Sequence, residues 1–134
     1  MLMVKALTYI DETSAITSFQ ILEDCIFVAN EALSETGLIE NAAQSCSAIV
    51  GQSYFDDDDT TGDSNSLVGY ISAIKKAEIH SLPKVSETII TKARLISRVD
   101  TGSVTLCTIA SQTFRNEELI VDCTMNFLIH EVGQ

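Results

Sequence analysis

Alternating apolar and polar residues mark most of the chain as β-strand. The clearest case is 119–130, where Leu119 and every second residue after it up to Ile129 are apolar or sulfur-bearing, while polar side chains dominate the positions between. Period two sustained over twelve residues predicts a strand with one buried face. Similar patterns predict strands from about 67, over about 88–100 and over about 103–113. The predicted turns between these strands are Leu82-Pro83, Asp100-Thr101-Gly102 and Asn116-Glu117.

The first third of the chain combines two short strands and one helix. Strands over about 2–10 and 14–22 are joined by the turn Asp11-Glu12-Thr13. Helical spacing of apolar residues then predicts a helix from about 35 to 50, which Ser34 or Thr36 caps and Gly51 ends. Small residues on its other faces let strands approach on every side, so we expect this helix to be central.

Two strands, one helix and four further strands indicate an α+β fold, with an antiparallel sheet of about six strands wrapped around the helix. No repeat or boundary divides the chain, so residues 1–134 form one predicted domain. Four adjacent aspartates within 55–66 predict a mobile acidic loop, because neighbouring carboxylates repel one another and stay solvated. A calcium loop starting at Asp57 would need glutamate at its twelfth position, where Val68 stands.

Composition and charge narrow the function classes. The apolar fraction of 46% supports a core, and no apolar run approaches the ~20 residues of a membrane span. The beginning of the chain lacks a charged segment and a small-residue cleavage site, so we expect a cytoplasmic protein. The net charge is −11, with the first 64 residues contributing twelve acids and one base, which argues against nucleic acid as a partner. Four scattered cysteines without a C-x-x-C pair predict buried thiols and no metal site.

Two segments carry a resemblance to a known family. The helix segment 37–44, Gly-Leu-Ile-Glu-Asn-Ala-Ala-Gln, resembles the E-A-x-A-Q helix of the 3-hydroxyacyl-acyl-carrier-protein dehydratases. Residues 74–89 resemble that family's following segment, with Val85-Ser86-Glu87 in the place of a P-G-D turn. The likeness covers nearly the whole chain and is closest to the divergent dehydratase-like proteins of aryl polyene pathways. It implies a hot-dog fold. The family usually has a further stretch before its first strand, so relative to the family we expect a shorter segment there.

The resemblance implies acyl-thioester chemistry centred on Glu40. Dehydration needs a base for the proton next to the thioester carbonyl, a proton donor for the leaving hydroxyl and stabilisation of charge on the carbonyl oxygen. Glu40 matches the family's helix acid, and Gln44 one turn later could orient it or bind the acyl group. The alternative is that both side chains are structural hydrogen-bonding groups. No cofactor is implied.

The family histidine does not match. Its position falls on Ile26, and both histidines of the chain, His80 and His130, come after the helix and are expected at the surface or rim. Asn30 is the nearest polar residue on the loop before the helix; it could bind a substrate hydroxyl or simply form a turn. Gly37 and Tyr70 complete the expected substrate-binding set, with Tyr70 lining an acyl channel or packing at a sheet edge.

Three functions stay open. The first is a dehydratase-like lyase that uses Glu40, the second a non-catalytic acyl-binding subunit that pairs with a histidine-bearing homologue, and the third an acyl-thioester hydrolase. The expected ligand is a thioester of acyl-carrier protein or coenzyme A, and the resemblance implies a homodimer with the acyl tunnel between subunits. An acidic carrier would have to dock on cations of the second half of the chain: Lys75, Lys76 and Lys84.

Overall fold

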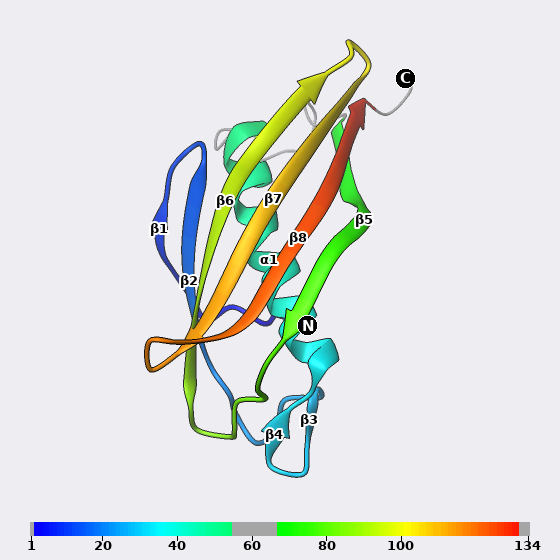
Figure 1. Ribbon diagram of the computed structural model, residues 1–134. Coiled ribbons are helices and arrows are strands. Elements are labelled where there is room, and N and C mark those ends of the chain that lie inside the picture. Colours follow the sequence, from blue (N-terminus) through cyan, green and yellow to red (C-terminus); the bar gives the residue numbers. More distant parts are fainter. Residues whose placement is uncertain (1, 55–66, 132–134) are drawn as a thin grey trace.

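The computed structural model describes the backbone of residues 2–54 and 67–131, and the side chains of 2–50 and 69–130. The predicted acidic loop at 55–66 and the calcium motif beginning at Asp57 lie outside these ranges. One long helix, α1 (Glu35–Tyr54), lies behind the long strands in the view of Figure 1. The strands are β1 (Ala6–Ile10), β2 (Ser14–Gln20), β3 (Val28–Ala29), β4 (Ala32–Leu33), β5 (Leu67–Ile79), β6 (Thr88–Asp100), β7 (Val104–Arg115) and β8 (Glu118–Glu131).

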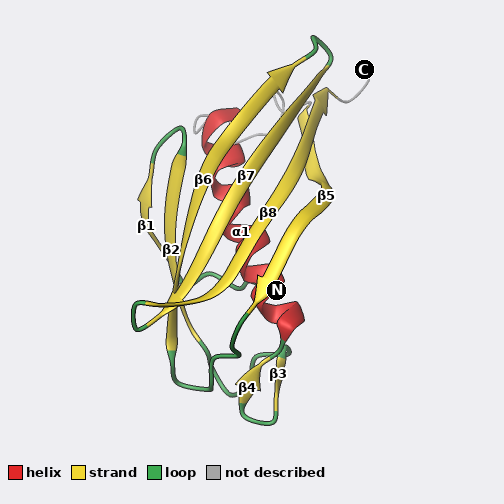
Figure 2. Cartoon of the chain, in the orientation of Figure 1, coloured by secondary structure: helices red, strands yellow, loops and turns green. Residues whose placement is uncertain are grey.

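Six of the strands form one antiparallel sheet in the order β1-β2-β6-β7-β8-β5, and α1 lies along one face of it (Figure 2). This confirms the predicted sheet of about six strands with a single packed helix. The core forms where buried residues of α1 meet the inward-facing residues of the strands; among its fully buried side chains are Leu38, Ile49, Ile89, Ile109 and Met125.

The alternation in β8 is interrupted at its beginning. From Val121 to Ile129 the odd positions are buried, as predicted, but Ile120 is also fully buried and Leu119 is only partly so. The cause is a bulge: Thr113 of β7 pairs with Val121 and Phe114 pairs with Leu119, which leaves Ile120 as an extra residue. Ile120 is one of the alternate positions that the pattern placed on the face away from the core, so for this residue the prediction is wrong.

The beginning of α1 agrees with the sequence, and its end does not. The Ser34 hydroxyl accepts a hydrogen bond from the Gly37 N–H at 3.2 Å, which makes Ser34 the cap. The helix continues through Gly51 to Tyr54. Gly51 was expected to end it, but that role needs a positive φ, and Gly51 is helical.

A short hairpin before α1 was not predicted. β3 and β4 are joined by Asn30 and Glu31, whose φ angles of 55° and 65° are those of a type I′ turn. The hairpin packs on the connection between β5 and β6, since the Leu33 N–H donates to the Pro83 carbonyl at 2.8 Å. These contacts fix the start of α1.

The sheet covers α1 from one side. Leu38, Ala42, Ser45 and Ile49 are buried on the sheet side, whereas Thr36 and Ser47 on the opposite side are exposed. The expectation that strands approach the helix on every side is therefore met on one side only. Among the described residues, no helix combines the length and apolar character needed to cross a membrane.

Candidate functional site on helix α1

The candidate site centres on Glu40, which is partly buried on the second turn of α1. Its carboxylate accepts a hydrogen bond of 3.1 Å from the side-chain amide of Gln44. The Gln44 carbonyl oxygen in turn accepts the backbone N–H of Met3 at 2.6 Å. Since an amide has one accepting and one donating end, the bond from Met3 fixes which end of Gln44 points to Glu40. The structure thus brings Glu40 and Gln44 together, as the i, i+4 spacing predicted.

The segment before β1 takes part in this arrangement, which sequence reasoning missed. The Asn41 amide donates to the Met3 carbonyl at 2.6 Å, so α1 holds both backbone groups of Met3. The Met3 side chain is itself fully buried. No local pattern in the sequence links a residue at position 3 to the helix, because the contact spans about forty residues.

Behind Glu40, a row of buried hydroxyl groups joins α1 to the sheet. The hydroxyl of Thr91 on β6 donates to the side-chain carbonyl oxygen of Asn41 at 2.6 Å. The same hydroxyl oxygen lies 2.9 Å from the hydroxyl oxygen of Thr113 on β7. Ser45 donates to the Asn41 backbone carbonyl at 2.9 Å and lies 2.7 Å from the Thr17 hydroxyl. All of these side chains are buried and bonded, so each contact constrains the helix against the sheet.

Glu40 faces away from the sheet. At about 3.6 residues per turn it shares its side of α1 with the exposed Ser47, opposite the buried Ala42 and Ile49. Glu40 is not among the lining residues of four hollows on the described part of the chain, although its side chain is partly buried.

An apolar slot lies further along the same side of α1. Ser47 and Val50 of the helix face Gly69, Tyr70, Ile71 and Phe127 across a hollow of about 170 Å³. A side chain on Gly69 would come within 3.6 Å of Ile129 and 3.8 Å of Val50, which is ordinary contact. Tyr70, predicted for an acyl channel, is thus at this slot; it is also 45% exposed at the edge of the sheet.

Gly37 and Asn30 have structural roles where they stand. A Cβ on Gly37 would lie 2.6 Å from Leu33 Cδ1 and 2.8 Å from Phe27 Cβ, so the glycine allows the hairpin to pack on the helix. Its N–H is taken by the Ser34 cap. Asn30 occupies the exposed turn between β3 and β4. A substrate-binding role for either stays a prediction.

The two histidines lie outside the hydrogen-bonded group around Glu40. His80 is exposed just after β5, and its N–H donates to the Ile120 carbonyl at 2.8 Å. His130 lies on the outer face of β8, edge-on to the Tyr70 ring with the centroids 5.8 Å apart. Neither has a contact with Glu40 that the described residues show.

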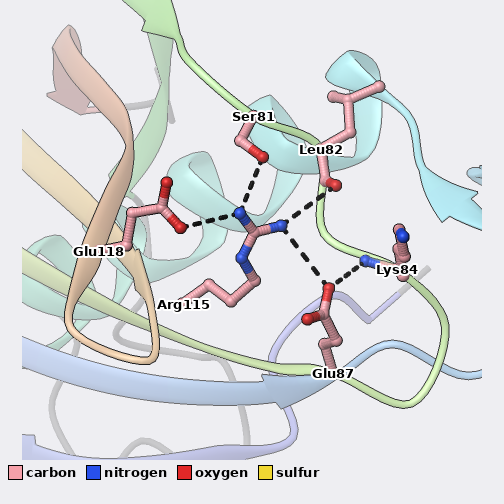
Figure 3. A network of polar contacts seen from close by, with 6 residues as sticks. All are labelled: Ser81, Leu82, Lys84, Glu87, Arg115 and Glu118. Atoms are coloured by element: carbon pink, nitrogen blue, oxygen red, sulfur yellow. Dashed lines mark hydrogen bonds and ion pairs between the residues drawn. The ribbon is translucent and has the colours of Figure 1, made fainter.

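The connection between β5 and β6 contains the segment likened to a P-G-D turn. Ser86 stands in the glycine's place and has a φ of 78°. Glu87 accepts the Lys84 N–H at 2.6 Å and lies 3.6 Å from Arg115, whose guanidinium also donates to Ser81 and Glu118, both at 2.9 Å (Figure 3). Glu118 raises the pKa of Arg115 by this hydrogen bond. Arg115 therefore ties the β7–β8 turn to this connection.

The predicted carrier-docking cations occupy different places. Lys75 and Lys76 are in β5, and Lys76 is already engaged, at 3.1 Å from Glu78 and 3.0 Å from Asp122. Lys84 lies in the β5–β6 connection, at a hollow that Glu23 and Glu31 also line. No described contact brings Lys75, Lys76 and Lys84 together into one patch. Docking of a carrier protein on them remains a prediction.

All four cysteines are buried thiols that form no disulfide, as predicted. Burial raises the pKa of Cys46 to about 12, so the thiol stays protonated near neutral pH. Within the described ranges, no three His, Cys, Asp or Glu side chains are grouped so that they could hold a metal ion.

Comparison with known proteins gives structural matches alone. No family model and no curated sequence matches this chain. Among solved structures, AziG from S. sahachiroi has a TM-score of 0.71 at 10% identity, covering 95% of this chain and 91% of that one.

Two further structures are similar at equally low identity. The dehydratase heterocomplex ApeI:P from Xenorhabdus doucetiae has a TM-score of 0.71 at 9% identity and covers 99% and 84% of the two chains. A hypothetical thioesterase with coenzyme A from Streptococcus pneumoniae has a TM-score of 0.67 at 9% identity and covers 96% and 88%. At such identities the likeness concerns the fold. The chain has the hot-dog fold.

Proposed function

We propose that this protein binds acyl thioesters beside Glu40 and acts as a dehydratase-like lyase on 3-hydroxyacyl thioesters of acyl-carrier protein or coenzyme A. The observation that carries the proposal is the hydrogen-bonded series from Met3 through Gln44 to Glu40. A partly buried carboxylate held by an amide of fixed orientation is suited to accept a proton at a defined point. The structural likeness to both a dehydratase heterocomplex and a hypothetical thioesterase with coenzyme A is consistent with thioester ligands.

Glu40 can serve both proton transfers in turn. Its carboxylate takes the proton from the carbon next to the thioester carbonyl as the bond to the 3-hydroxyl breaks. The carboxyl then gives that proton to the departing hydroxide, which leaves as water, and the 2-enoyl thioester remains. One carboxylate therefore replaces the acid and base pair of the family, at the cost of one general acid–base contribution of about 10²–10⁴ in rate.

The site requires a second subunit to exclude water. Glu40 faces away from its own sheet, and β5 is an exposed edge strand whose Ile71 and Ile74 are 39% and 49% exposed. Antiparallel pairing of β5 with a second copy would cover this edge and bring a neighbouring surface towards α1. We propose a homodimer of this kind, in the cytoplasm, where the four cysteine thiols would remain reduced.

The direct test is the absorbance of the 2-enoyl thioester formed from 3-hydroxyacyl thioesters of several chain lengths. Glu40→Gln keeps the shape and the bond to Gln44 but cannot take a proton, so we expect turnover to fall by about a hundredfold or more. Glu35→Gln, at an exposed position in the first turn of the same helix, is the matched control and should keep its activity. Equal activity of wild type and Glu40→Gln would refute the assignment.

The second candidate is a non-catalytic subunit, which the position of the histidines favours, since neither contacts Glu40. The heterocomplex nature of the ApeI:P dehydratase is a precedent in this fold for unlike partners. Tight acyl-thioester binding without turnover, and turnover only after mixing with a histidine-bearing homologue, would identify this role. Release of free thiol without enoyl product would instead indicate the third candidate, a thioester hydrolase.

A further inference from the structure

A second hollow lies on the face of the sheet that points away from α1. It has a volume of about 480 Å³, within the ~300–1,000 Å³ typical of small-molecule sites. Ser14, Ile16, Lys92, Arg94, Gln112 and Asp122 are among its lining residues, and they alternate with buried residues that face the helix. The hollow is therefore separated from Glu40 by the sheet, and it is independent of the function proposed above.

The cross-strand pairing explains why there is a hollow here. Arg94 of β6 pairs with Ser14 of β2 on one side and with Ala110 of β7 on the other. The side chains of Ser14 and Ala110 are short, so the surface beside Arg94 is recessed. In the adjacent row Lys92 pairs with Ile16 and Gln112, whose longer side chains form a wall. Tyr9, 48% exposed on β1, closes the hollow at the edge of the sheet.

Two basic side chains, Lys92 and Arg94, line this hollow. They are two positions apart on one strand and so stand on the same face, about 7 Å apart along it. Neither forms an ion pair with any side chain that the structure describes, although the chain has 19 acids and 8 bases. The ammonium of Lys92 lies 5.3 Å from the centroid of the ring of Phe114, which pairs with Ile90. The ammonium therefore leans to the side away from Arg94, where Lys92 and Glu117 line a neighbouring hollow.

Two of the acids nearby are already engaged. Asp122, on the rim of the hollow, lies 3.0 Å from Lys76. Asp11 accepts the Tyr9 hydroxyl and the backbone N–H groups of Thr13 and Ser14. The Tyr9 ring is thus held by its hydroxyl, with its edge and face left as an apolar wall. What the hollow presents is two cations, the Ser14 hydroxyl and the Gln112 amide beside an aromatic ring.

We propose that this hollow binds a small phosphorylated ligand with a flat or apolar body. The planar guanidinium of Arg94 can donate two parallel hydrogen bonds to phosphate oxygens, and Lys92 adds a second charge when its side chain turns from Phe114 towards the ligand. Ser14 and Gln112 can donate to the remaining oxygens. The body of the ligand rests against Tyr9. The site lies on a different face of the sheet from the thioester site and takes its ligand whether or not Glu40 is catalytic.

The test is isothermal titration of the full chain with phenyl phosphate and with inorganic phosphate at constant ionic strength. We expect saturable binding of one equivalent, tighter by several-fold for phenyl phosphate because of the contact with Tyr9. Arg94→Gln and Lys92→Gln should each weaken binding at least tenfold. Lys75→Gln, which removes the same charge from an exposed position on β5, should leave it unchanged.

Two further variants separate the contributions. Arg94→Lys keeps the charge but loses the two parallel hydrogen bonds of the guanidinium, so we expect intermediate affinity. Tyr9→Ser should remove the preference for phenyl phosphate but not the binding of inorganic phosphate. Circular dichroism of each variant checks that the sheet is retained. Absence of saturable binding by wild type, or equal weakening by Lys75→Gln and Arg94→Gln, would overturn the proposal, since it would reveal only general attraction to positive charge.

Discussion

Replacing Asn41 by leucine tests whether the polar contacts between α1 and the sheet hold the helix in place. Asn41 is 1% exposed; it donates to the Met3 carbonyl and accepts the Thr91 hydroxyl, both at 2.6 Å. Because Thr91 uses its one proton on Asn41, Thr113 must donate in the 2.9 Å contact between the two threonines. Leucine would leave the Met3 carbonyl and one hydroxyl proton buried without a partner.

Each buried group left unsatisfied costs about 1–3 kcal/mol, so Asn41→Leu should destabilise the fold by about 3 kcal/mol after a partial gain from the added apolar surface. For a domain of this size that corresponds to a fall in Tm on the order of 10 °C. The measurement is urea unfolding followed by circular dichroism. Ser47→Ala, an exposed position on the opposite side of α1, is the control and should change stability by less than about 0.5 kcal/mol.

A double-mutant cycle distinguishes a specific contact from general loss of packing. Thr91→Val has nearly the same shape and removes the hydroxyl, and on its own it should cost about 1–3 kcal/mol. In Asn41→Leu/Thr91→Val both partners are gone, so the combined loss should be smaller than the sum by about 1 kcal/mol or more. Strictly additive losses, or a cost below about 1 kcal/mol for Asn41→Leu, would show that these contacts do not couple the helix to the sheet.

Three further predictions concern single positions. Gly37→Ala should destabilise the fold by about 1–3 kcal/mol in urea unfolding, because the new methyl would meet Leu33 and Phe27 at 2.6 and 2.8 Å; an unchanged midpoint would mean that the hairpin yields freely. Ser86→Gly should stabilise by about 1 kcal/mol, since φ is 78° there, and a loss of stability would contradict this account of the turn. Because burial holds the pKa of Cys46 near 12 against 9.0 for an exposed thiol, the unfolded thiol ionises first as pH rises. Stability should therefore be full below pH 9 and fall by about 1.4 kcal/mol per pH unit between 9 and 12, and Cys46→Ala should reduce that slope.

The sequence predicts the architecture well because the elements that define it are long and periodic. Strands β5 to β8 each have 12 to 14 residues, so the alternation averages over local exceptions, and the turn at Asn116-Glu117 lies between β7 and β8 as predicted. Short or irregular features escape this reasoning. The two-residue strands β3 and β4 have no period to detect, and the bulge at Ile120 depends on how β8 pairs with β7.

The candidate site is predictable only in part. The spacing of Glu40 and Gln44 predicts their contact, because residues four apart in a helix are neighbours. The role of Met3 depends on a contact between segments far apart in the sequence, and nothing within the helix indicates it. The direction that Glu40 faces depends on which side of α1 the sheet covers. Small residues such as Ala43 and Ser47 fit either a covered or an open side, so composition alone could not decide this.

The row of threonine and serine hydroxyls between α1 and the sheet has a consequence for how the helix is set. Purely aliphatic surfaces can slide or rotate past each other by small amounts with little change in energy, because dispersion contacts are not directional. Hydrogen bonds from Thr17 to Ser45 and from Thr91 to Asn41 are directional, and they permit one rotation and one axial position of the helix. The direction in which Glu40 points is thus set from the other side of its own helix, by residues that face the sheet.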